Sequence, residues 1–89
     1  MARYRLRYVT YATEQLRHLP PSLHTAYSAL IEELVRDPHA AGKYNERACS
    51  YSTTFSGSEE SGIIIYAISD EIMTVTITRV NWVKVVKPR

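Results

Sequence analysis

The amino-acid sequence predicts an α+β domain in which a helical hairpin packs on a four-stranded, mainly antiparallel sheet. Residues 4–11 alternate with the period of a strand, and residues 12–36 carry apolar side chains with the period of helices. Three further segments between residues 49 and 80 are rich in β-branched and aromatic residues, so the element order is β-α-α-β-β-β. A chain of 89 residues has no room for a second core, and residues 1–89 are expected to form one domain.

The first predicted strand has one aromatic face and one basic face. Its alternating side chains are Tyr4, Leu6 and Tyr8 against Arg3, Arg5 and Arg7. Because arginine is costly to bury without a partner, the tyrosine face should meet the core. The arginine stripe should then face solvent or a ligand.

Two stretches that end at prolines predict the helical hairpin. The first is expected to open with Thr10 or Thr13 as its N-cap and to end at Pro20-Pro21. The second should open with Ser22 as its cap and stop at Asp37-Pro38. The residues expected to pack on the sheet are Leu16, Leu19, Tyr27, Leu30 and Leu34. Residues 38–46 are expected to form a polar connector.

Three strands are predicted after this connector. Residues 49–55 alternate like a half-buried strand, whereas residues 63–68 are apolar on both faces, which is typical of a central strand. A turn at residues 69–71 precedes the last strand, in which Met73, Val75 and Ile77 share a face. Continued alternation would place Arg79 on the same face as these three residues.

Basic residues gather at the two ends of the chain. Residues 1–13 and 72–89 hold seven arginines and lysines and no acid, whereas residues 14–71 hold the other four basic residues and all nine acids. If both end segments lie in the sheet, they form a basic face that can hold phosphates. The alternative is that these charges serve solubility alone.

The sequence excludes several classes of chemistry. A single cysteine, Cys49, allows no internal disulfide and suits a reducing cytoplasm. The three histidines lack metal-ligand spacing, and three glycines provide no phosphate-binding loop, so no metal or cofactor is expected. No apolar run has the roughly 20 residues that a membrane span needs. The N-terminal arginines interrupt any signal-peptide core.

Four segments carry a resemblance to a known family. They are the tyrosine-rich first strand, Leu16-Arg17-His18-Leu19-Pro20, residues 34–38 with Gly42, and Ile65-Tyr66-Ala67-Ile68-Ser69-Asp70. In this order and spacing, they resemble the RelE/ParE superfamily of bacterial toxins, from about Tyr4 to Trp82. The resemblance implies the toxin component of a type II toxin–antitoxin system and a cognate antitoxin as its partner.

The ribonuclease branches of that superfamily, RelE and YoeB, imply a specific chemistry. They inhibit translation by cleaving mRNA on the ribosome without a metal, using a base, an arginine that stabilises charge and an acid. Glu46 resembles the base of the YoeB branch, and Arg79 resembles the arginine of its last strand. Ile63 stands where the family has a third-strand arginine. Asn81-Trp82 stands where it has a His-Tyr pair, and neither side chain is a useful acid.

The resemblance therefore implies a metal-free endoribonuclease with altered catalytic positions. The candidate catalytic residues are Glu46 and Arg79, and the candidate RNA contacts are Arg3, Arg5, Arg7, Asn81, Trp82, Lys84 and Lys87. One alternative is a silent member that binds an antitoxin or nucleic acid and cuts nothing, and another is a gyrase poison of the ParE kind. Glu46 also fits a solvated loop carboxylate and Trp82 a core anchor. Self-association through an open strand edge is a further expectation.

Overall fold

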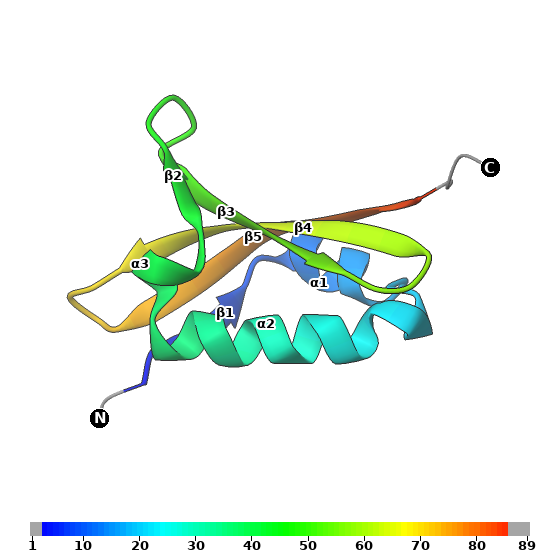
Figure 1. The fold of residues 1–89 in the computed structure, drawn as a ribbon. Coiled ribbons are helices and arrows are strands. Elements are labelled where there is room, and N and C mark those ends of the chain that lie inside the picture. Colours follow the sequence, from blue (N-terminus) through cyan, green and yellow to red (C-terminus); the bar gives the residue numbers. More distant parts are fainter. Residues whose placement is uncertain (1–2, 86–89) are drawn as a thin grey trace.

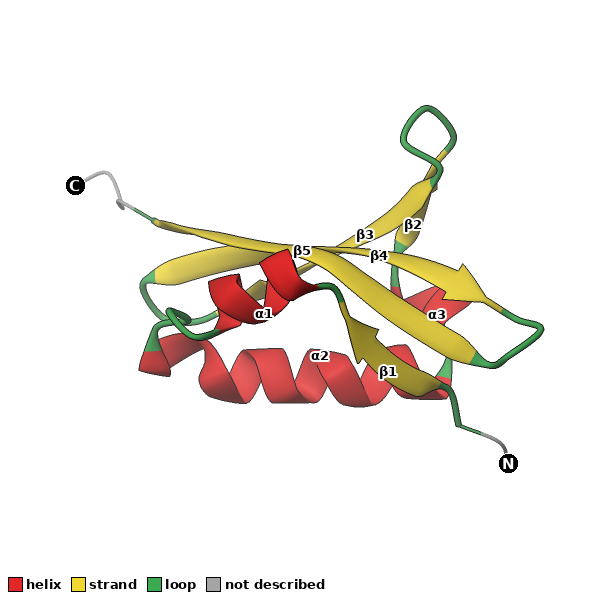
Figure 2. Cartoon of the chain, turned by 180° about the vertical axis from the view of Figure 1, so that it is seen from behind, coloured by secondary structure: helices red, strands yellow, loops and turns green. Residues whose placement is uncertain are grey.

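The computed structural model describes residues 3–85. Its elements are β1 (Arg5–Tyr8), α1 (Thr10–Leu16), a 3-10 turn η1 (Pro21–Leu23), α2 (His24–Arg36), α3 (Pro38–Ala41), β2 (Lys43–Asn45), β3 (Ser50–Ser56), β4 (Glu60–Ser69) and β5 (Thr74–Lys84). The strands form one sheet in the order β1-β5-β4-β3-β2. Figure 1 shows α1 and α2 on the same side of this sheet, and Figure 2 shows the same layers from behind.

The predicted α+β class and the mainly antiparallel sheet are confirmed, but the sheet has a fifth strand. Strands β2 to β5 pair antiparallel with their neighbours, and β1 pairs parallel with β5, with Leu6 beside Val75. The fifth strand, β2, lies in the segment expected to be a connector. It pairs with β3 from Lys43 to Asn45 and lies at the edge of the sheet. Three residues are too few for a periodic pattern to predict a strand.

The same segment also contains the short helix α3. Asp37 caps it, because its side chain accepts a hydrogen bond from the Ala40 N–H at 3.3 Å, and Pro38 occupies the first turn. Gly42 then lets the chain pass close to β4, since a Cβ at this position would collide with the Tyr66 hydroxyl. Asp37 therefore both ends α2 and starts α3.

The observed N-caps of the two helices differ from the predicted caps by one residue in opposite directions. Val9 is the N-cap of α1 and Leu23 that of α2, and neither provides a side-chain cap. The predicted caps Thr10, Thr13 and Ser22 are therefore wrong. Thr10 lies inside α1, and the Ser22 hydroxyl hydrogen-bonds to Glu60 of β4. The predicted stop of α2 before Asp37-Pro38 is confirmed.

The core lies between the helices and one face of the sheet. Leu19, Leu30 and Leu34 are buried as predicted, and Leu16 and Tyr27 are half-buried and pack against the same cluster. From the sheet, the fully buried members are Ile64, Tyr66, Val75, Ile77 and Val80. Tyr66 keeps its polar end satisfied, because its hydroxyl donates to the Pro38 carbonyl at 2.8 Å. Burial raises the pKa of Tyr66 to about 12.

A β-bulge in β5 changes the face on which Arg79 lies. Ile77 pairs with Tyr66 and Arg79 with Ile65, so Thr78 is the extra residue of β5 at this point. The Thr78 hydroxyl donates to the Ile65 carbonyl at 3.2 Å. Beyond the bulge, Val80 takes the buried position and Arg79 is exposed. The predicted shared face for Arg79 and Ile77 is therefore wrong, because regular alternation does not continue through Thr78.

Candidate nucleic-acid interface

The sheet has a core face and an uncovered face, which we call the open face. Side chains of directly paired residues lie on the same face, so Arg79 shares a face with Ile65, and Asn81 shares it with Ile63. Arg5 and Arg7 belong to this face through their partners Thr74 and Thr76. The residues of the open face include Arg5, Arg7, Lys43, Ser52, Thr54, Ile63, Ile65, Ala67, Thr74, Thr76, Arg79 and Asn81.

The charge on the open face is positive only. Arg5, Arg7, Lys43 and Arg79 are exposed there. Glu60 is the only acid within the described strands, and its hydrogen bond with Ser22 of η1 places it toward the helices. A surface with several cations and no acid in its strands attracts phosphates. This arrangement confirms that the two basic end segments meet in one sheet.

Lys43 and Arg79 lie in one row across four strands. Lys43 pairs with Ser52, Ser52 with Ile65, and Ile65 with Arg79. Three strand spacings separate the two basic residues, which corresponds to about 14 Å between their backbones. Sequence reasoning missed Lys43, because it assigned this residue to the connector. No local pattern identifies it, because β2 has only three residues.

Helix α1, which accepts a hydrogen bond from the backbone of β5 at the edge of the sheet, contacts two of the predicted site residues, the catalytic candidate Arg79 and the RNA-contact candidate Asn81. The Arg79 Cζ atom lies 5.8 Å from the centroid of the Tyr11 ring, within the range of a cation–π interaction. The Gln15 Nε2 atom donates to Asn81 Oδ1 at 2.7 Å, and Gln15 Oε1 accepts from the Val80 N–H at 2.8 Å. Sequence reasoning assigned no role to Tyr11 or Gln15, since contacts between distant segments leave no local pattern.

Glu46 lies apart from Arg79 in the sheet. It is exposed in the turn between β2 and β3, where its carbonyl accepts from the Cys49 N–H at 3.3 Å. Figures 1 and 2 show this turn projecting from the sheet on the side away from α2. The structure thus puts Glu46 in the turn of the β2–β3 hairpin, whereas Arg79 lies within β5.

The structure does not bring the other predicted contacts to the open face. Trp82 pairs with Gly62 on the core face and packs against the core cluster, so adjacent Asn81 and Trp82 point in opposite directions. Arg3 forms an exposed salt bridge with Glu32 of α2, with Nη2 and Oε2 2.8 Å apart. Lys87 lies outside the described residues.

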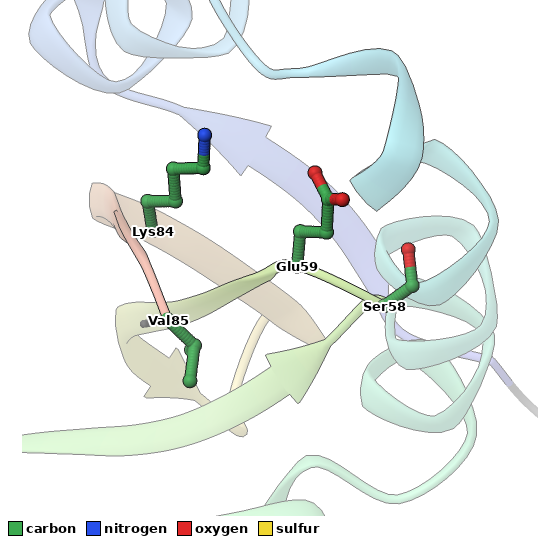
Figure 3. Close-up of a pocket in the computed structure, with 4 residues that line it drawn as sticks. All are labelled: Ser58, Glu59, Lys84 and Val85. Atoms are coloured by element: carbon green, nitrogen blue, oxygen red, sulfur yellow. The ribbon is translucent and has the colours of Figure 1, made fainter. Parts of the chain in front are cut away.

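Lys84 lies at the end of β5 beside acidic residues. It pairs with Glu60, which places both on the helix-bearing side, and it lines a hollow of about 390 Å³ with Ser58, Glu59 and Val85. Figure 3 shows the Lys84 and Glu59 side chains extending in the same direction, whereas Val85 points the other way. The nearby carboxylates reduce the local attraction of Lys84 for a phosphate.

A second polar cluster joins four segments at the opposite end of the sheet. Asp70 accepts a hydrogen bond from the Tyr4 hydroxyl at 2.6 Å, and His39 Nε2 lies 2.8 Å from the same carboxylate oxygen. The other ring nitrogen of His39 lies 3.1 Å from the Tyr51 hydroxyl. The hydrogen bonds from Tyr4 and His39 hold the pKa of Asp70 below its usual value. This cluster fastens α3 and the segment before β1 to the β4–β5 turn.

Two other kinds of site are absent from residues 3–85. No helix in this part of the chain is long and apolar enough to cross a membrane. Within the same residues, no three histidine, cysteine or carboxylate side chains gather where they could hold a metal ion.

The architecture defines a class of small α+β domain with a mixed sheet, one face covered by helices and the other open and basic. Comparison with known proteins gives this class a family. The sequence matches no protein-family model, and no curated protein matches it significantly. Solved structures do match. The toxin–antitoxin complex RelBE2 from Mycobacterium tuberculosis contains a chain that is 30% identical, with a TM-score of 0.72, over 89% of this chain and 96% of that one.

Two E. coli structures share the fold at lower identity. The intact RelBE toxin–antitoxin complex matches at 20% identity and a TM-score of 0.74, over 88% of this chain and 94% of the other. A free RelE toxin with two arginines replaced by alanine matches at 22% identity and the same TM-score, over 91% of this chain and 83% of the other. The chain belongs to the RelE-like superfamily of toxins, as its sequence pattern predicted.

Proposed function

We propose that this protein is the toxin of a type II toxin–antitoxin system and that its open face binds ribosome-associated mRNA in the bacterial cytoplasm. The observation that carries the proposal is the exposed Arg79, which shares the open face with three other cations and no strand acid. Phosphate attraction needs only clustered positive charge, so this face suits an RNA backbone. The likeness to a RelE toxin supports the same assignment.

Cleavage by this face is expected to be slow or absent. In the family chemistry, Arg79 would stabilise the charge that develops on the phosphate and Glu46 would act as the base. Ile63, at the position of the family's third-strand arginine, lies next to Asn81 on the open face and brings no charge. Removing one such electrostatic contact costs a factor on the order of 100 to 1000 in rate. RNA binding should therefore survive better than cutting.

Induced expression followed by primer extension on host transcripts tests this proposal. Slow or undetectable cleavage is expected for the wild-type protein, and discrete, strong cleavage abolished by Glu46→Ala would contradict impaired chemistry. If weak cleavage is seen, Arg79→Ala should reduce it and the matched variant Arg36→Ala, which removes an exposed charge from α2, should not. Cleavage that is indifferent to both Glu46→Ala and Arg79→Ala would remove these residues from the site.

A silent binding module is the second candidate, and the position of Ile63 is the observation that favours it. The variant Ile63→Arg distinguishes a toxin with impaired cleavage from a silent binding module, because it returns a cation to the open face beside Asn81. A gain of ribosome-dependent cleavage would show that only this charge was lacking. If neither the wild type nor Ile63→Arg cleaves RNA while both still bind it, the silent binding module is favoured. Inhibition of DNA supercoiling without RNA binding would instead indicate a gyrase poison.

The proposed partner is a cognate antitoxin. Two of the similar solved structures are toxin–antitoxin complexes, and a third holds a RelE mutant with an antitoxin peptide. A chain of 89 residues buries a smaller share of its surface than a larger domain does, so a partner that covers part of it would stabilise it. Co-purification of a small protein encoded beside this gene is expected. A strictly monomeric protein from which no partner is recovered would contradict this part of the proposal.

A further inference from the structure

We infer that α1 positions the contact residues of the open face, and that it holds Asn81 as a hydrogen-bond donor to a phosphate oxygen beside Arg79. The inference rests on the proposed binding of RNA by this face. Tyr11 and Gln15 are then positioning residues, and the Asn81 side-chain amide has one orientation, with its NH₂ group turned toward the ligand.

The spacing of two pairs of residues explains why they meet. Tyr11 and Gln15 are four residues apart on α1, so they lie on the same side of the helix. Arg79 and Asn81 are two residues apart on β5 and lie on the same face of the strand. Tyr11 supports the Arg79 guanidinium at 5.8 Å from its ring centroid, and Gln15 holds Asn81 at 2.7 Å. One turn of α1 therefore orients both polar groups.

The orientation of the Asn81 amide follows from a chain of hydrogen bonds. The Val80 N–H can only donate, so the Gln15 atom that it meets at 2.8 Å must be the carbonyl oxygen. The other end of the Gln15 amide is then the NH₂ group, which can only donate, so the Asn81 atom facing it is Oδ1. The Asn81 Nδ2 group points away from Gln15, and it has no hydrogen-bond partner within residues 3–85.

This arrangement selects the chemistry of the ligand. A guanidinium and an amide NH₂ group are both donors, so together they suit an anionic acceptor such as a phosphodiester oxygen. Their strand neighbours, Ile63 and Ile65, have no acceptor that would compete. Asn81 therefore supplies a second donor on a face where Ile63 supplies none.

The decisive variant is Gln15→Glu. A glutamate still accepts from the Val80 N–H but cannot donate to Asn81 Oδ1, so the Asn81 amide should turn its NH₂ group inward and expose its oxygen. Binding of a fluorescent single-stranded RNA oligonucleotide, measured by anisotropy, should weaken about tenfold, as expected for loss of a hydrogen bond to a charged group. Thr13→Glu adds the same charge at an exposed position of α1, and screening should limit its effect to about twofold.

Substitutions at two further positions test the same contacts, and circular dichroism shows whether each variant is folded. Asn81→Asp preserves the bond from Gln15 but replaces the donor by an anionic acceptor, so it should weaken binding more than Gln15→Glu does. Tyr11→Phe should bind like the wild type and Tyr11→Leu more weakly, because phenylalanine retains the ring under Arg79. If wild-type protein binds no RNA, the proposed function falls and this inference falls with it. If the wild type binds and both Gln15→Glu and Asn81→Asp match Thr13→Glu, the inference alone is overturned.

Discussion

The core face and the open face of β5 differ in what holds their side chains in place. On the core face, Val75, Ile77 and Val80 are inaccessible to solvent, so packing from both the helices and the neighbouring strands fixes them. On the open face, Arg79 and Asn81 are exposed and are held by single contacts to Tyr11 and Gln15. A substitution on the core face should therefore change stability, whereas one on the open face should change binding with little effect on folding.

The largest effect is expected for Leu30→Ala on the helix that covers the core face. Leu30 is 7% exposed and belongs to the core cluster, so its truncation removes apolar contacts and leaves a cavity. The free energy of unfolding should fall by about 2–5 kcal/mol in urea denaturation. Thr54→Ala, at an exposed position of the open face, is the control and should change it by less than about 0.5 kcal/mol. A loss below that value for Leu30→Ala would mean that α2 does not face the core.

A smaller loss of stability is expected for Tyr66→Phe. The substitution retains the buried ring, which stacks on Tyr51 with centroids 5.5 Å apart, and removes only the hydroxyl that donates to the Pro38 carbonyl. Leaving that acceptor without its donor should cost about 1–3 kcal/mol in the same unfolding measurement. Tyr44→Phe is a matched control, because Tyr44 is 53% exposed. Equal losses for the two variants would show that the contact with α3 does not stabilise the fold.

On the open face, a substitution should weaken RNA binding and leave stability nearly unchanged. Arg79→Ala should leave the free energy of unfolding within about 0.5 kcal/mol of the wild-type value. It should weaken binding to single-stranded RNA and reduce the slope of log K against log salt by about 0.7, as expected for one lost phosphate contact. Arg36→Ala removes the same charge from α2 and should leave the slope unchanged. Equal slopes for both variants would show that the attraction comes from net charge rather than from the open face.

The comparison of the two faces also shows which features a sequence can predict. The order of elements and the apolar helix stripe follow from periodicity, so Leu30 and Leu34 were predicted correctly. The face of Arg79 was not, because the bulge at Thr78 interrupts the alternation. The signal was present in the spacing of the apolar residues, since Val80 follows Ile77 by three positions rather than two. A shift in phase of this kind is the mark of an extra residue in a strand.

Contacts between segments that are distant in the chain could not be predicted from the sequence. Gln15 meets Val80 and Asn81 only because α1 packs beside β5, and nothing in residues 10–16 indicates that neighbour. The His39–Asp70 contact likewise depends on α3, which is only four residues long. Local propensity predicts elements, whereas the geometry of a site depends on how those elements pack.

The smallest effect on stability is expected for Asp70, which is exposed in the turn between β4 and β5. Its pKa is lowered in the folded protein by hydrogen bonds from Tyr4 and His39, so folding favours the ionised form. The resulting stabilisation is present above the pKa of the unfolded chain, near 3.8, and is lost as the pH falls through the lower folded value. The unfolding midpoint of the wild type should therefore drop more steeply below that pH than the midpoint of Asp70→Asn, in thermal scans at a series of pH values. Glu71→Gln removes a neighbouring carboxylate that makes no hydrogen bond within residues 3–85, and it should keep the wild-type slope. If Asp70→Asn and the wild type lose stability in parallel, the cluster around Asp70 does not fasten the β4–β5 turn.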